Sequence, residues 1–223
     1  GGGDGQITLF ISEYIEGSGN NKAIEIYNNS SQAVDLTTAN VSLARFSNGS
    51  SSGTNIALTG TIPANGTYVI VHTSANADFK AKADQESGSV NHNGDDAYTL
   101  SVDGVVVDSF GQVGTDPGSR WGSGDTTSQN DTLVRKPSVF AGDTVIDDAF
   151  DPATQWIGLP QDTFSELGQH EVDLRELFFS EYIEGSSSNK AIEIYNPNGT
   201  DIDLAEGNYS VELYSNGRVL TDG

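Results

Sequence analysis

Apolar and polar residues alternate over short stretches along most of this chain, and this period predicts β-strands rather than helices. Ile7 to Ile15 alternates in this way, and Ala23 to Tyr27 follows after a turn rich in Gly and Asn, so we expect a hairpin. A second hairpin is expected where Asp103-Gly104 separates two apolar segments. The pattern predicts further strands at residues 34–36, 41–46, 58–62, 67–72 and 132–135.

The residue pattern in the rest of the sequence predicts little regular structure. One short helix is expected through Phe79 to Ala83, with Ser74 as its N-cap. Residues 136–170 are expected to be irregular, with large apolar side chains as anchors, namely Phe150, Trp156, Phe164 and Leu167. Short strands at this spacing, with one short helix, favour an antiparallel β-sandwich.

The chain contains a long internal repeat. Residues 12–28 and 180–196 are identical at fifteen of seventeen positions, at a constant offset of 168 residues. Because this period is the length of a domain, we expect a linker or tag at 1–6, a complete domain at 7–171 and the first part of a second copy at 172–223. We expect the chain to be part of a longer protein, because the second copy ends before its later strands.

Charge and composition limit the functions to consider. The chain has 32 acidic and 10 basic residues, a net charge of −22, and no Cys or Met. Thiolate metal sites, disulfides and Cys nucleophiles are excluded. Direct binding of nucleic acid is not expected without a cation, because phosphate contacts require Lys and Arg. No apolar run is long enough for membrane insertion, and the acidity suits an extracellular medium rich in salt or calcium.

Several sequence phrases follow one another in a characteristic order. The repeated phrase is preceded by Ile and followed by VDL, and further phrases come after it: GDDAYTL, VVVDSFGQVGTDPGSRWG, NDTLVRK, FDPATQW and DTFSELGQH. These phrases cover most of residues 9–171, and a second copy begins at 177. Together they resemble the lamin-tail domains of bacterial secreted proteins.

The resemblance implies an immunoglobulin-like β-sandwich. It also implies an accessory module that is secreted or displayed at the bacterial cell surface, often beside an extracellular endonuclease/exonuclease/phosphatase-type catalytic domain. No such catalytic domain is recognisable within these 223 residues.

The repeated phrase carries the first candidate site, formed by Glu13, Glu16, Lys22 and Glu25. A Glu–Lys pair across the hairpin is the structural interpretation, and we favour it. The alternative is that Glu16 and nearby loop carbonyls hold a cation.

Two further candidates lie downstream. Asp95 and Asp96 follow Gly94 before a strand, and such paired carboxylates are ligands that Ca²⁺ prefers, although turn capping explains most Asp residues of this kind. Arg120 and Trp121 lie in an expected loop, so Trp121 is a candidate stacking platform, with core packing as the alternative.

Catalysis is not expected from these residues. His72, His92 and His170 share no metal-binding spacing, and the chain has no Gly-x-Ser-x-Gly nucleophile elbow. No cofactor is required, with Ca²⁺ as the one candidate.

Two functions remain. The first is a non-catalytic accessory module that spaces, targets or assembles a larger enzyme. The alternative is a calcium-assisted binding domain for extracellular DNA, glycan or protein. Because the second copy lacks counterparts of the later strands, we also expect residues 177–215 to dock against another part of the polypeptide or against a second copy.

Overall fold

The computed structural model describes residues 7–173, 177–197, 202–205 and 209–214, and the expected linker at 1–6 lies outside them. The chain divides into two compact units, Gly1–Leu174 and Arg175–Gly223. We call them unit 1 and unit 2 and describe each by itself.

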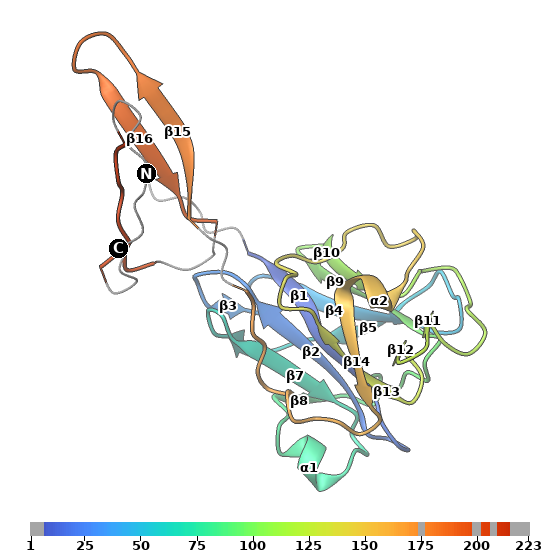
Figure 1. Ribbon diagram of the computed structural model, residues 1–223. Helices are drawn as coiled ribbons and strands as arrows, with labels where there is room; N and C mark the ends of the chain where they lie inside the picture. The colour runs from blue at the N-terminus through green and yellow to red at the C-terminus, as the bar shows by residue number, and fades with distance from the viewer. Residues whose placement is uncertain (1–6, 174–176, 198–201, 206–208, 215–223) are drawn as a thin grey trace. The chain divides into compact units, whose positions relative to one another are not determined.

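Unit 1 is built on a six-stranded sheet that is antiparallel except for its last pair (Figure 1). β1 and β2 lie at its centre, with two strands on either side of the pair. In order across the sheet, the strands are β14 (Trp156–Pro160), β13 (Asp131–Arg135), β1 (Leu9–Glu16), β2 (Lys22–Asn28), β7 (Thr67–Val71) and β8 (Gln85–Glu86).

A second, antiparallel sheet completes the sandwich. Its strands, in order, are β10 (Val105–Phe110), β9 (Ala97–Val102), β4 (Val41–Phe46) and β5 (Thr54–Ala57). Two small ribbons lie in the connections: β3 (Val34–Asp35) with β6 (Thr61–Ile62), and β11 (Gly122–Ser123) with β12 (Thr126–Thr127). The immunoglobulin-like sandwich implied by the resemblance is therefore confirmed.

Alternation along the central strands separates two apolar clusters. Leu9, Ile11, Tyr14, Ile24 and Ile26 belong to a large cluster that also includes β4 and β9 side chains, between the sheets. The opposite face of the six-stranded sheet, which we call the outer face, carries a smaller cluster formed by Ile15, Ala23, Val69, Val71, Ala75, Phe79 and Leu167.

One buried carboxylate connects the two sheets. Asp108 of β10 accepts hydrogen bonds from Ile11 N of β1 at 2.7 Å and from Asp143 N at 2.7 Å. Its partner is Arg135 of β13, whose Nη2 lies 3.1 Å from Asp108 Oδ1, and both side chains are 0% exposed. The register of β1 against β2 shifts between Ile11 and Glu13, so this β-bulge lies beside the Asp108 contact.

The predicted hairpins of unit 1 are confirmed. β1 pairs with β2, and β9 pairs with β10. Asp103 (φ 48°) and Gly104 (φ 78°) both adopt the left-handed conformation that a two-residue hairpin turn of this type requires.

The helix prediction was wrong in number and in start. α1 (Ala77–Lys80) is capped by Asn76, whose side chain accepts from Phe79 N, rather than by Ser74. A second helix, α2 (Pro152–Gln155), lies in the region expected to be irregular and is followed by β14. Asp151 as N-cap and Pro152 at the first position are helix-start signals that the four-residue length concealed. None of the described helices has the length and apolar character to span a membrane.

Unit 2 contains a hairpin of β15 (Phe178–Glu184) and β16 (Lys190–Tyr195). Residues 209–214, at the repeat positions of β4, form no strand. In unit 1 the corresponding strand, β4, is hydrogen-bonded to β5 and to β9. No strand pairs with residues 209–214 within the described part of unit 2, which explains the difference.

We predict that Asp108→Asn destabilises unit 1 by about 3–5 kcal/mol, because it leaves Arg135 buried without its counter-charge. The measurement is urea unfolding followed by the fluorescence of Trp121 and Trp156, both of which are buried in unit 1. The control is Glu86→Gln, which breaks the exposed 2.9 Å pair with Lys80 and should cost about 0–1 kcal/mol. Equal effects of the two substitutions would contradict the central role of Asp108.

Candidate functional site

Two of the predicted acidic residues meet on the outer face of the six-stranded sheet. Glu13 of β1 and Glu25 of β2 are register partners, and they are 1% and 0% exposed. Ser12 Oγ donates to Glu25 Oε1 at 2.6 Å, and Gly168 N donates to Glu25 Oε2 at 2.6 Å. Neither oxygen of Glu13 has a hydrogen-bond partner among the described residues. Burial thus brings a satisfied carboxyl group next to an unsatisfied one.

The two carboxyl groups differ in proton affinity. Burial, together with the charge of Glu25, raises the pKa of Glu13 to about 9. Burial also raises the pKa of Glu25, to about 7, against the lowering effect of the hydrogen bonds from Ser12 and Gly168. Glu13 is therefore protonated at neutral pH, while Glu25 titrates there.

A covering segment, residues 163–170, lies over this pair. Leu167 is 1% exposed within the outer-face cluster, and the Phe164 ring lies 4.7 Å from the ring of Phe79. Lys82 Nζ donates to the carbonyl of Leu167 at 2.7 Å. Together with the hydrogen bond from Gly168 N to Glu25, these interactions attach the covering segment to the outer face of the six-stranded sheet and to Lys82, which follows α1.

The covering segment ends in an aromatic contact. The His170 ring lies 5.6 Å from Phe10 and 5.0 Å from Tyr27, and its Nε2 is buried without a hydrogen-bond partner in the described structure. Burial and the charge of Arg135 lower the pKa of His170 to about 4, so the imidazole is neutral at pH 7. A cavity of about 300 Å³ lies beside it, lined by Val134, Arg135, Pro137, Ile157, Leu159, Glu166, Gln169, His170 and Glu171.

Glu16 and Lys22 form the predicted cross-strand pair. They are register partners at the end of the β1–β2 hairpin, with Lys22 Nζ 3.4 Å from Glu16 Oε1. Asn130 N donates to Glu16 Oε2 at 2.8 Å. Burial raises the pKa of Glu16 despite these contacts. Both oxygens of Glu16 are thus used within unit 1, as the structural interpretation requires.

The two aspartates proposed for calcium differ in their contacts. Asp96 Oδ2 accepts from Arg45 at 2.7 Å and its Oδ1 accepts from Asn48 N at 3.1 Å. Asp95 Oδ1 is buried without a partner, and burial with the charge of Asp96 raises the pKa of Asp95. No group of three or more His, Cys, Asp or Glu side chains in the described residues is arranged to hold a metal ion. Calcium binding stays a prediction.

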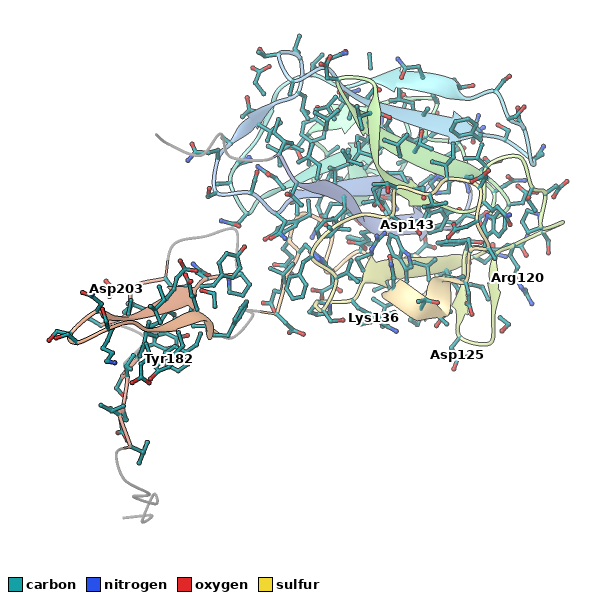
Figure 2. The ribbon with its side chains drawn as sticks, turned by 90° about the horizontal axis from the view of Figure 1, so that it is seen from above. Arg120, Asp125, Lys136, Asp143, Tyr182 and Asp203 are labelled. Carbon is teal, nitrogen blue, oxygen red and sulfur yellow. The ribbon has the colours of Figure 1, made fainter. Side chains whose placement is uncertain are left out.

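Trp121 is not the exposed stacking platform that the sequence left open. It is 6% exposed, belongs to the inter-sheet cluster, and its ring meets the Phe150 ring edge-on at 5.8 Å. The loop turns the indole inward because Gly111, which approaches the indole nitrogen, has no side chain to exclude it. Arg120, in contrast, is exposed at the periphery of unit 1 (Figure 2).

The histidines serve in packing. His92 is fully buried and hydrogen-bonds to the Tyr98 hydroxyl at 2.8 Å and the Ile15 carbonyl at 2.7 Å. Burial lowers the pKa of His92 to about 3, so it remains neutral. His72 Nδ1 accepts from Ser74 N in a turn.

Sequence reasoning missed the residues that complete the outer-face site. Ser12 contacts Glu25 within the β1–β2 hairpin. Lys82 contacts Leu167, and Gly168 contacts Glu25, over separations of 85 and 143 residues. It also missed Asp108 and Arg135, although each is the one charged residue in its predicted strand. That pattern was the available signal, because a charge within a buried strand needs a partner.

We predict that Glu13→Gln raises the free energy of unfolding of unit 1 at pH 8 by about 2 kcal/mol or more. The pKa of Glu13 is higher in the folded than in the unfolded chain, so folding takes up a proton and stability falls as pH rises from about 5 to about 9. The Gln variant removes this contribution. The decrease in the free energy of unfolding that remains between about pH 5 and pH 7 is then due to Glu25.

The measurement is urea unfolding at several pH values. The matched control is Glu181→Gln, which makes the same change at the exposed position equivalent to Glu13 and should leave the pH dependence of unit 1 unchanged. An identical pH slope in wild-type protein and in Glu13→Gln would contradict the assignment.

The comparisons with known proteins identify the fold family. Residues 5–114 match the family model of the Lamin Tail Domain. The matched segment runs from the start of β1 past the end of β10, and β13 and β14 then complete the six-stranded sheet of the same unit. Comparison with curated proteins and with solved structures finds no significant match. Unit 1 is therefore a lamin tail domain.

Proposed function

We propose that the chain is a non-catalytic accessory module of a secreted or cell-surface protein, attached to an extracellular nuclease- or phosphatase-type enzyme. The module spaces, targets or assembles that larger protein. The lamin tail domain is itself a non-catalytic, immunoglobulin-like domain. The association with an enzyme rests on the resemblance of the sequence phrases to bacterial lamin-tail domains.

The observation that carries this proposal is the use of buried charge inside unit 1. Asp108 is neutralised by Arg135, Asp96 by Arg45, and Glu16 by Lys22. Catalytic groups must face a substrate and reach its reacting atoms. These side chains face one another instead, so their chemistry is directed to holding the fold.

Surface charge supports an extracellular setting. The net charge of −22 keeps such a module soluble and makes it repel polyanions. A spacer with this surface does not compete with a linked nuclease for DNA. The absence of Cys and Met from the sequence also removes the side chains most easily oxidised outside the cell.

The accessory role predicts that antibodies against unit 1 recover, from the medium or surface of the source cells, a polypeptide larger than 223 residues that hydrolyses phosphoesters. The purified 223-residue chain should show no such activity and no saturable binding to duplex DNA. Antigen confined to the cell interior, or hydrolysis by the purified chain, would overturn the proposal.

A calcium-assisted binding domain is the second candidate. The observation in its favour is Asp95, whose Oδ1 is buried without a described partner and whose charge contributes to the raised pKa of Glu16. A cation there would satisfy that oxygen and offset the repulsion between the carboxylates.

This candidate predicts that millimolar Ca²⁺ raises the unfolding temperature of the chain and permits saturable binding of DNA, glycan or protein. Asp95→Asn should abolish both effects. Asp125→Asn, at an exposed turn of unit 1 (Figure 2), should leave them intact. The outcome is measured by calorimetry with and without a chelator, and no response of the wild-type chain to Ca²⁺ would exclude this function.

A further inference from the structure

The outer face of unit 1 holds a buried acid without a hydrogen-bond partner. Glu13 is 1% exposed, and neither of its carboxyl oxygens is hydrogen-bonded to any described residue. Its register partner on β2 is Glu25, so the two carboxyl groups lie side by side on one face of the sheet. The flanking strands place the uncharged Val134 and Val69 opposite these two residues. A charge on Glu13 would therefore stand next to Glu25 without water to screen it, and the protonated acid is the form that suits this position.

The charged groups around this pair come from three further parts of unit 1. Lys82, which follows α1, lowers the pKa of Glu13, whereas Glu25 and Glu166 of the covering segment raise it. Asp84, the residue before β8, raises the pKa of Glu25. Among the described residues that act on the pair, acids therefore outnumber bases.

The covering segment over this pair contributes no strand to the sheet. The hydrogen bonds that join it to other elements run from Lys82 Nζ to the carbonyls of Leu167 and Ser165, from Gly168 N to Glu25 Oε2, and from Thr132 Oγ1 to the carbonyl of Thr163. Its apolar contacts are those of Phe164 and Leu167 with the outer-face cluster. A small set of side-chain contacts, rather than a ladder of backbone hydrogen bonds, thus holds the segment in place.

The sheet beneath is held independently of this segment. β1 is paired with β2 and β13, and β2 is also paired with β7. The large inter-sheet cluster contains neither Phe164 nor Leu167. The segment can therefore leave the outer face while both sheets keep their hydrogen bonds and their shared core, and such local opening costs less than unfolding of the whole unit.

We propose that the covering segment is a pH-sensitive latch. It closes over the Glu13–Glu25 pair while Glu13 carries its proton, and it opens, with the sheet intact, when Glu13 releases that proton to water. Opening hydrates both carboxyl groups and exposes part of the outer-face cluster. The latch belongs to unit 1 and does not depend on the accessory role of the whole chain.

The direction of the pH effect follows from burial. In the closed form the pKa of Glu13 is about 9, and in the open form contact with water returns it toward the ordinary value of 4.5. The open form therefore binds fewer protons, so its population rises with pH between these values and levels off above about pH 9. Glu25, whose pKa is about 7 in the closed form, adds to the rise below about pH 7. The latch is thus most firmly closed in acid and loosens toward alkaline pH.

The test is hydrogen exchange in the full chain, followed at single amides by NMR. The amides of Leu167, Gly168 and Gln169 report opening, because each is hydrogen-bonded in the closed form. We expect their protection against exchange to fall by about tenfold per pH unit between about pH 7 and about pH 9, since opening releases one proton from Glu13. At each pH they should exchange at least about tenfold faster than the amides of residues 23–27, whose exchange requires the sheet to unfold.

Two variants separate titration from packing. Glu13→Gln keeps the size of the side chain but cannot ionise, so protection of the three reporter amides should become independent of pH between about pH 7 and about pH 9. The matched control, Leu167→Ala, removes an apolar contact and no ionisable group. It should lower protection by about tenfold or more at every pH and keep the wild-type slope.

The measurement on the wild-type chain decides the matter even if a variant fails to fold. Equal protection at residues 167–169 and at residues 23–27 would mean that the segment opens only when the whole unit unfolds, and it would overturn the proposal. Protection at residues 167–169 that does not change with pH, or the full wild-type slope in folded Glu13→Gln, would overturn it as well.

Discussion

The sandwich depends on one buried carboxylate, that of Asp108. The β-bulge in β1 begins directly after Ile11, and Asp108 from the opposite sheet accepts a hydrogen bond from Ile11 N. A carboxylate so deeply buried requires a counter-charge, which Arg135 provides from β13. Since these three residues belong to three strands and two sheets, the ion pair is complete only when the two sheets are stacked. This fixes one arrangement of the sandwich rather than merely favouring a compact one.

The same bulge also positions the acidic site. The shift between Ile11 and Glu13 brings Ser12 Oγ to Glu25 and places Glu13 on the outer face with Ile15. The covering segment then removes both carboxyl groups from water, through Leu167 and the contact of Gly168 with Glu25. The burial of Glu13 costs least while that group keeps its proton, so apolar packing around Leu167 and the hydrogen bond from Gly168 to Glu25, rather than an ion pair of Glu13, hold the outer face together. The stability of unit 1 is consequently tied to pH at this position.

The strands and the hairpin turns could be predicted from the sequence because they rest on local patterns, alternation in β1 and β2 and Asp103-Gly104 between β9 and β10. The short α2 and β14 escaped notice because four or five residues carry too little periodicity. The site was only half visible. Glu13, Glu16, Lys22 and Glu25 lie within one hairpin, whereas the contacts of Gly168 and Arg135 close over long sequence separations that no local pattern reveals. Trp121 was ambiguous for the same reason, since its burial depends on Phe150.

The two hairpins separate what sequence dictates from what surroundings dictate. Nearly identical residues produce the same pairing, the same bulge and the same turn in both units, so these features are local. Burial is not local: Tyr14 is 0% exposed and Tyr182 is 69% exposed. An isolated two-stranded hairpin is marginal in water, because it gains little apolar burial for the backbone entropy that it loses. Burial of the hairpin in unit 1 therefore depends on its neighbours, namely β7 and β13 in the same sheet and the side chains of the opposite sheet, and not on the hairpin sequence itself.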